Sequence, residues 1–131
     1  MPDNVATVHE LYARFQRGDV PAILEMLHPD VVWEHDAVDH GIPWLRPGRG
    51  REHVAGFFGA LAGLEFHAFA PEAILADAHH VGVFVRHDLT VRATGKRLTG
   101  VELHYWTFDA EGRIIAMKHF VDTLAHRDAA G

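Results

Sequence analysis

Cysteine is absent from the 131 residues of the chain, which excludes disulfide bonds, thiolate catalysis and cysteine-ligated metal sites. No run of 18 apolar residues is present, so no segment is predicted to cross a membrane. The N-terminal stretch MPDNVATVHELY lacks a basic segment followed by an apolar one, which argues against a signal peptide. Together these absences predict a cytoplasmic protein with no membrane partner.

Positive charge is also scarce, because 12 Lys and Arg residues face 18 Asp and Glu residues, for a net charge of −6 with neutral histidines. Phosphate contacts need positive charge, so nucleic acid is not a predicted partner. Histidine, in contrast, is abundant: the chain has 12, as many as all Lys and Arg together. Most of them are expected on the surface, and the question is which ones are not.

The length suits one domain spanning residues 1–131, with a sizeable core. Apolar residues at helical spacing predict three N-terminal helices: one after Asp3 or Asn4, a short one from Asp19, and one over 51–61. The rest predicts antiparallel strands near 65–76, 79–93, 97–109 and 113–123, separated by the turn signals ADA, TGK and AEG. An earlier strand is expected over 31–35, and the tail HRDAAG is expected to fray. This order predicts an α+β domain.

Alternation along the strands selects four histidines for the inner face of the sheet. One histidine interrupts an apolar row in each strand: His35 after VVWE, His87 after VGVFVR, and His119 after IIAMK, while His104 shares its face with Glu102 and Trp106. The alternative for each is a core histidine bonded to a carbonyl or to water. A small core seldom contains four polar groups, because burying each one without a hydrogen-bond partner costs free energy. The four together therefore predict a polar cluster inside the domain.

Three stretches of the chain resemble a known family: RGDVPAILEMLHPDVVWEH, GRGREHVAGFF and HYWTFDAEGRIIAMKHFVDT. They are similar to the ketosteroid isomerase-like, SnoaL-like branch of the nuclear transport factor 2-like superfamily. The resemblance implies a cone: a strongly curved antiparallel sheet wraps around a pocket that the helices close. It also implies a homodimer. Members include isomerases, polyketide cyclases, epoxide hydrolases, dehydratases and binding modules, so the fold alone does not settle the function.

The usual catalytic residues of these relatives are replaced here. By the resemblance, His35 stands where ketosteroid isomerases have a general-base Asp, and His104 where they have a protonated Asp. Their first-helix Tyr matches Leu11 or Phe15, neither of which can donate a hydrogen bond. The paired Asp residues of the epoxide hydrolases match His87 and His119, and the Arg between them matches Val85.

We therefore expect histidine-mediated proton transfer on a small apolar, carbonyl-bearing ligand, of the isomerase, cyclase or dehydratase type. In this hypothesis His35 is the base, His104 an electrophilic donor, and His87 and His119 are further acid–base groups or anchors. Asp36 and Glu102 would orient or charge neighbouring rings, and Glu102 could itself act as base. The expected apolar walls are Trp33, Phe57, Phe58, Val85, Trp106, Met117 and Val121.

Two alternatives remain open. The same pocket suits a binding module without catalysis. Inward imidazoles with Glu102 also suit Zn²⁺, Fe²⁺ or Ni²⁺, although no spacing matches a defined metal motif, so neither a metal nor another cofactor is expected. Asp36, Asp39 and His40 are expected at the pocket mouth. The homodimer is expected to bury Tyr105 and Phe120, which point to the face of their strands opposite to that of the histidines.

Overall fold

The structure is a computed structural model that describes residues 3–131, and it contains one mixed sheet with helices on its concave side. The helices are α1 (Asn4–Gln16), α2 (Val20–Glu25), α3 (Arg51–Ala60), the 3₁₀ turn η1 (Leu61–Gly63) and α4 (Thr123–Ala130). The strands are β1 (Leu27–Trp33), β2 (Gly48–Arg49), β3 (Leu64–Ala76), β4 (His80–Val91), β5 (Lys96–Phe108) and β6 (Ile114–Phe120). The predicted α+β class, the three N-terminal helices and the four-strand meander are all confirmed.

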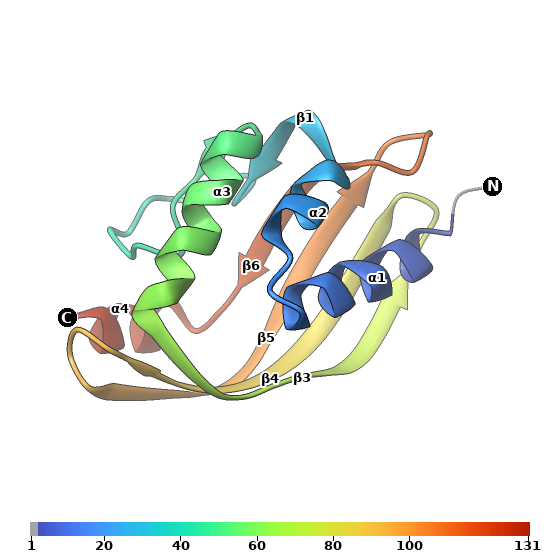
Figure 1. Cartoon of the computed structure of the whole chain (residues 1–131). Helices are drawn as coiled ribbons and strands as arrows, with labels where there is room; N and C mark the ends of the chain where they lie inside the picture. Colours follow the sequence, from blue (N-terminus) through green and yellow to red (C-terminus); the bar gives the residue numbers. More distant parts are fainter. Residues whose placement is uncertain (1–2) are drawn as a thin grey trace.

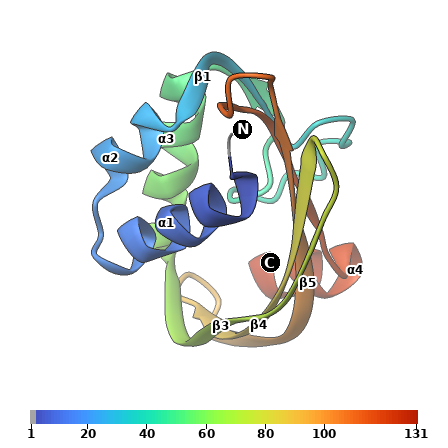
Figure 2. The same ribbon diagram turned by 90° about the vertical axis from the view of Figure 1, so that its right-hand side faces the viewer.

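The six strands lie in the order β2-β1-β6-β5-β4-β3. Neighbours from β3 to β6 pair antiparallel, as expected, but β1 pairs with β6 in parallel. Parallel pairing needs a long crossover, and here the whole chain from β2 to β5 makes it. Figure 2 shows the sheet curving from beneath α1, α2 and α3 up along one side, without closing into a barrel.

Helices α1 and α2 begin at side-chain caps, and together with α3 they cover the concave face. Asp3 accepts a hydrogen bond from the backbone N–H of Ala6 at 3.0 Å, and Asp19 caps α2 in the same way through Ala22 at 3.2 Å. The inner stripe of α1 is buried against the sheet through Val8, Leu11 and Tyr12. No helix within residues 3–131 is both long and apolar enough to cross a membrane.

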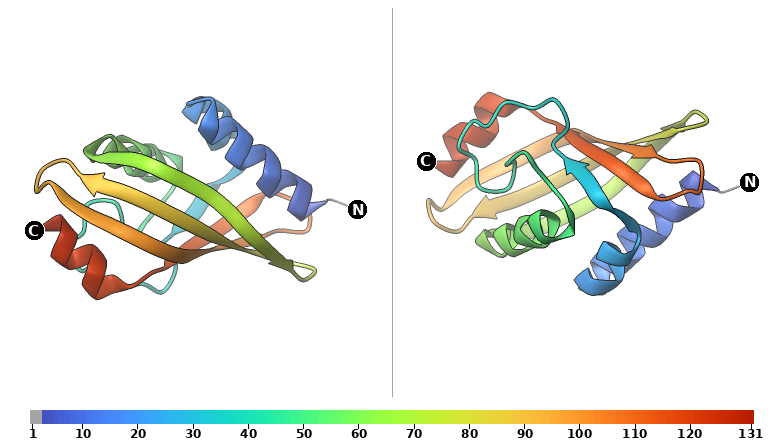
Figure 3. Two further views of the ribbon diagram at one scale, coloured as in Figure 1. Left: turned by 90° about the horizontal axis from the view of Figure 1, so that it is seen from below. Right: turned by 90° about the horizontal axis from the view of Figure 1, so that it is seen from above.

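The C-terminal tail is a helix, so the expectation that it frays is wrong. Asp122 caps α4 by accepting a hydrogen bond from the N–H of Ala125 at 3.1 Å, and the helix docks against a separate core cluster that includes Ile42 and Trp44. Figure 3 shows α4 at the end of the sheet opposite the N-terminus, next to the β4–β5 turn. This docking buries His126, which is only 4% exposed.

Removing the cap should loosen α4. We expect Asp122→Ala to lower the free energy of unfolding by about 1 kcal/mol, because the N–H of Ala125 loses its acceptor. Urea denaturation measures the change. Asp128→Ala, which removes an exposed carboxylate from the same helix, serves as the control and should change stability less. An equal loss in both variants would contradict the capping role.

Candidate functional site

A cavity of about 70 Å³ lies between the concave face of the sheet and the helices. Its wall is largely aromatic, with Phe and Trp side chains from α1, α3, β1, β3 and β5. Titratable side chains also reach it: Tyr12, Glu102, His104, His119 and His126. Sites for drug-sized ligands are usually about 300–1,000 Å³. This cavity therefore suits a small ligand, or a larger one if the aromatic walls move.

Most of the expected wall residues line this cavity, and two do not. Trp33, Phe57, Phe58, Trp106 and Met117 lie in its wall. Val85 faces the same side as its cross-strand partner Glu102 but is fully buried, so core side chains cover it. Val121 lies beyond the end of β6, where strand alternation stops, and borders a depression on the other side of the sheet.

His35 does not reach the cavity, so its predicted inward placement is wrong. Strand β1 ends at Trp33, and Glu34 and Asp36 both have positive φ angles, 55° and 59°. This turn breaks the two-residue alternation on which the prediction relied. Glu34 is consequently buried, whereas the side chain of His35 is 57% exposed.

Asp36 is also exposed, and its carboxylate lies 3.3 Å from Nε2 of His35, outside the cavity. It borders the outer depression together with His40, Phe120 and Val121. Glu102 and His119 border that depression as well as the inner cavity. Asp36 and His40 thus line the outer depression rather than the cavity, Asp39 lines neither, and Asp36 orients no cavity histidine.

His104 lies at the centre of a chain of hydrogen bonds. Its Nδ1 is 2.6 Å from the hydroxyl of Tyr12, and its Nε2 is 2.9 Å from Oε1 of Glu102. The indole N–H of Trp106 donates to the Tyr12 oxygen at 3.3 Å. In the neutral ring, Tyr12 therefore donates to Nδ1 and Nε2–H donates to Glu102.

The electrostatics of this chain follow from its burial. Burial lowers the pKa of His104, although the adjacent Glu102 partly opposes the shift. Burial would raise the pKa of Glu102, but the hydrogen bond from His104 and the surrounding imidazoles outweigh it and lower this pKa to about 2. Burial also raises the pKa of Tyr12 far above its usual value. Near neutral pH the chain is thus a protonated Tyr12, a neutral His104 and an ionised Glu102.

Tyr12 is a site residue that the family resemblance does not identify. The expected match to the family tyrosine is Leu11 or Phe15, both of which also line the cavity. Helical periodicity puts Tyr12 on the apolar face of the first helix, and that face does point inward. A buried tyrosine hydroxyl usually finds a polar partner, and this one signal could have identified it.

His119 and Glu34 form a second pair. The carboxylate of Glu34 accepts the backbone N–H of His119 at 2.9 Å and a short hydrogen bond from its Nδ1. The parallel register of β1 and β6, with Trp33 opposite Met117, brings the two residues together. Burial would lower the pKa of His119, but the carboxylates of Glu34 and Glu102 outweigh it and raise this pKa.

Because Nδ1 of His119 is bonded to Glu34, Nε2 is the ring nitrogen that Glu34 does not engage. The ring lines the cavity and lies 4.7 Å, between centroids, from that of His104. An imidazole whose Nδ1–H is held by a carboxylate presents an Nε2 that can accept a proton. Neither the sequence pattern nor the resemblance singles out Glu34.

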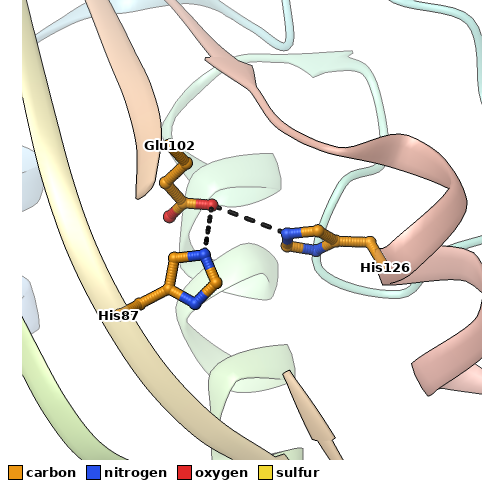
Figure 4. Close-up of side chains that lie close together, drawn as sticks. All are labelled: His87, Glu102 and His126. Carbon is orange, nitrogen blue, oxygen red and sulfur yellow. Dashed lines mark ion pairs between the residues drawn. The ribbon is translucent and has the colours of Figure 1, made fainter. Parts of the chain in front are cut away.

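His87 and His126 approach the other oxygen of Glu102. Nε2 of His87 lies 3.8 Å and Nε2 of His126 3.7 Å from Oε2 (Figure 4). The sequence does not indicate His126, because the tail is expected to fray. Three of the four predicted histidines, His87, His104 and His119, are thus brought together around Glu102, and His126 takes the place expected for His35.

Two overlapping groups have the spacing of metal ligands. His87, Glu102 and His126 form one, and Glu102, His104 and His119 the other, with potential ligand atoms within 4.8 Å of one another in each. In the second group Nε2 of His104 is already engaged by Glu102. A metal ion there would have to displace that hydrogen bond.

Solved structures with the same fold cover nearly the whole chain. A nuclear transport factor 2-like protein from Burkholderia thailandensis E264 is 27% identical, with a TM-score of 0.83 over 100% of this chain and 99% of its own. TerC, co-crystallized with polyporic acid, is 24% identical, with a TM-score of 0.78 over 97% of both chains.

A third structure is that of SalBIII, an epoxide hydrolase/cyclase-like enzyme with a role in pyran ring formation in salinomycin. It is 23% identical, with a TM-score of 0.69 over 89% of this chain and 88% of its own. No curated protein matches the chain. The family model of the SnoaL-like domain matches residues 8–117. The chain therefore belongs to the SnoaL-like domain family, in the nuclear transport factor 2-like fold.

Proposed function

We propose that this protein is an enzyme that moves a proton on a small apolar, carbonyl-bearing ligand, in a reaction of the isomerase, cyclase or dehydratase type. The observation that carries the proposal is the His119–Glu34 pair at the wall of an aromatic cavity. A histidine held by a buried carboxylate is a general base that works near neutral pH. A module that only binds apolar ligands would not need a buried carboxylate bonded to a histidine at the cavity wall.

His119 takes the role of base that the sequence suggests for His35. Its Nε2 removes a proton from the carbon next to the ligand carbonyl, and the electron pair of that C–H bond moves into the enolate. Glu34 stabilises the imidazolium that forms and fixes its orientation. Returning the proton to another carbon gives an isomerase, and attack by the enolate carbon on an electrophilic carbon gives a cyclase.

His104 fits a positioning role rather than the donor role that the sequence suggests. Tyr12 and Glu102 occupy both of its ring nitrogens, so no N–H remains for the ligand. The chain of hydrogen bonds instead fixes Glu102 at the cavity wall, where its charge and that of Glu34 favour a protonated His119.

The relatives support chemistry or binding on small molecules in this kind of cavity. TerC has been co-crystallized with polyporic acid, and SalBIII is described as an epoxide hydrolase/cyclase-like enzyme. For this chain the test needs no knowledge of the natural substrate. A panel of cyclic ketones and enones is incubated with the protein in D₂O, and exchange at the carbon next to the carbonyl is followed by NMR.

The expected result is exchange with at least one compound at a rate well above that in buffer, and its loss in His119→Ala. Compounds that bind, as judged by chemical-shift changes or thermal stabilisation, without any exchange above buffer would favour the alternative of a non-catalytic binding module.

We also propose that the protein forms a homodimer through the outer face of the sheet. Phe84, Val101, Tyr105 and Phe120 are between 36% and 46% exposed there. Light scattering at micromolar concentration should give close to twice the chain mass of 14.6 kDa. Phe120→Asp should shift the protein to the monomer because it places a charge in the apolar patch. Leu124→Asp, at an exposed position on α4 and away from this face, is the control, and a monomeric wild-type protein would refute the proposal.

A further inference from the structure

Glu102 uses only one of its two carboxylate oxygens in a hydrogen bond. Oε1 accepts from His104 at 2.9 Å, while Oε2 lies 3.7 Å from Nε2 of His126 and 3.8 Å from Nε2 of His87. Both distances are too long for direct hydrogen bonds. Figure 4 shows the two rings, from β4 and α4, turned toward this oxygen from different sides.

The side chain of His87 is buried and forms no hydrogen bond within residues 3–131. Its residue is 5% exposed, its Nδ1 is buried with no partner, and its Nε2 reaches only the distant Glu102 oxygen. Most buried polar side-chain atoms in proteins are hydrogen-bonded, and an unmet one costs free energy. The Nε2 atom of this unpaired ring faces Oε2 of Glu102, and Glu102 lines the cavity although His87 itself does not, which points to a partner at Nε2 that is not part of the protein.

The proton of the neutral His126 ring is placed by Trp44. The indole Nε1 can only donate, and it lies 3.0 Å from Nδ1 of His126, so Nδ1 accepts and Nε2 carries the hydrogen. Burial lowers the pKa of His126 to about 4, which keeps the ring neutral near pH 7. His126 therefore presents an N–H to the space beside Glu102, and no acceptor in the part of the chain that the structure describes lies within hydrogen-bonding distance of it.

We propose that His87, Glu102 and His126 form a subsite for a hydroxyl group of the ligand, an alcohol or a phenol. The hydroxyl oxygen accepts a hydrogen bond from Nε2–H of His126 and, in the tautomer of His87 that carries its proton on Nε2, from that ring as well, and it donates its own hydrogen to Oε2 of Glu102. The three atoms lie within 4.8 Å of one another, which leaves a point about 2.8 Å from each, a normal hydrogen-bond length. The assignment rests on the proposed function in one respect only, which is that both place the ligand in the same cavity.

A metal ion fits the same three residues less well. Coordination through Nε2 of His126 needs a lone pair on that nitrogen, which moves the proton of the neutral ring to Nδ1. Two N–H groups would then face each other at the 3.0 Å contact with Trp44. A hydroxyl group requires no such rearrangement, and it satisfies two donors and one acceptor at once.

The test compares phenol with toluene, which has nearly the same shape but no hydroxyl. Dissociation constants are measured by NMR chemical-shift titration of the whole protein. Phenol should bind at least about tenfold more tightly, since a site built to hydrogen-bond a hydroxyl rejects an analogue without one. His87→Phe keeps a ring of similar size but removes the donor, so it should reduce the preference by about fivefold or more while toluene binds as before.

His9→Phe, at an exposed position on α1, is the matched control and should keep the wild-type preference. Equal affinities of phenol and toluene for the wild-type protein would overturn the proposal. So would a wild-type preference that survives unchanged in His87→Phe, or Zn²⁺ binding at micromolar affinity that His87→Phe abolishes. Because binding is measured without turnover, a failure to exchange hydrogen in D₂O would refute the proposed reaction and leave the subsite standing.

Discussion

Replacing His119 with alanine should lower kcat by about 10²–10⁴ for any compound whose hydrogen the wild-type protein exchanges, because a general base typically contributes this much. The fold should persist, since His119 lies at a cavity wall and its β-strand contacts are made by the backbone. The rate of exchange in D₂O is the measurement, with circular dichroism as the check on folding. A variant that is folded and exchanges as fast as the wild type would exclude His119 as the base.

Glu34→Gln gives the sharper result, because it changes the position of one proton on the imidazole and little else. The two oxygens of Glu34 accept two N–H groups, the backbone N–H and Nδ1–H of His119. A glutamine amide has only one oxygen that can accept one of these N–H groups, so its NH₂ must face either the backbone nitrogen or Nδ1 of His119. The backbone N–H cannot give up its hydrogen, so Nδ1 becomes the acceptor and the ring proton moves to Nε2.

A neutral histidine with its proton on Nε2 cannot take another from the ligand at that atom. We therefore expect Glu34→Gln to lose activity nearly as completely as His119→Ala, by about 10²–10⁴, with the fold retained. Nitrogen-15 NMR of the His119 ring should show the change of tautomer directly. Glu111→Gln, in the exposed turn before β6, is the control. Wild-type activity in Glu34→Gln would show that Glu34 does not orient the ring.

Acidification from pH 7 to pH 4 should destabilise the protein strongly, and His126 should account for about 3 kcal/mol of the loss. The pKa of His126 is lowered from 6.5 to about 4, by burial first. Between these values the unfolded chain binds the proton and the folded chain does not, so stability falls as pH decreases through this window. A tenfold change in proton affinity corresponds to about 1.4 kcal/mol. The His126 side chain is only 5% exposed, so solvent screens little of this free energy.

The groups around His126 act on its charge in both directions. Glu102 on β5 and Asp122 at the start of α4 favour the protonated ring, while His87 on β4 and His119 on β6 disfavour it. His119 itself has a raised pKa, so the stability that it contributes is present at low pH and is lost as pH rises through that pKa. The total pH dependence therefore combines opposite contributions, and a variant is needed to isolate His126.

His126→Asn isolates it, because the asparagine Oδ1 can still accept from Trp44 but cannot take up a proton. Urea denaturation at pH 7 and pH 4 should show a difference about 3 kcal/mol smaller in His126→Asn than in the wild type. His9→Asn, at an exposed site on α1, should leave the difference unchanged. If His126→Asn and the wild type lose the same stability on acidification, the buried ring is not the cause.

The sequence by itself determined the fold class, the meander and the inward faces of the long strands. Two-residue alternation depends only on extended backbone, so it held wherever β4, β5 and β6 are regular and placed His87, His104 and His119 near one another. In β5, Glu102, His104 and Trp106 share the inward face, as the alternation predicts. Periodicity likewise placed Tyr12 on the inner face of α1.

Only the tertiary structure decided what happens where regular structure stops. At the end of β1, two residues with positive φ angles turn the chain so that Glu34, and not His35, is buried. The local sequence does not predict this turn, because the contact of Glu34 with β6 stabilises it. Helix α4 packs against an apolar surface that includes Trp44 and Ile42, about 80 positions earlier in the chain, and this packing buries His126. A short helix gains its stability from such packing rather than from its own sequence. The proposed general base and the proposed hydroxyl subsite thus rest on two contacts between distant segments, Glu34 with His119 and Trp44 with His126.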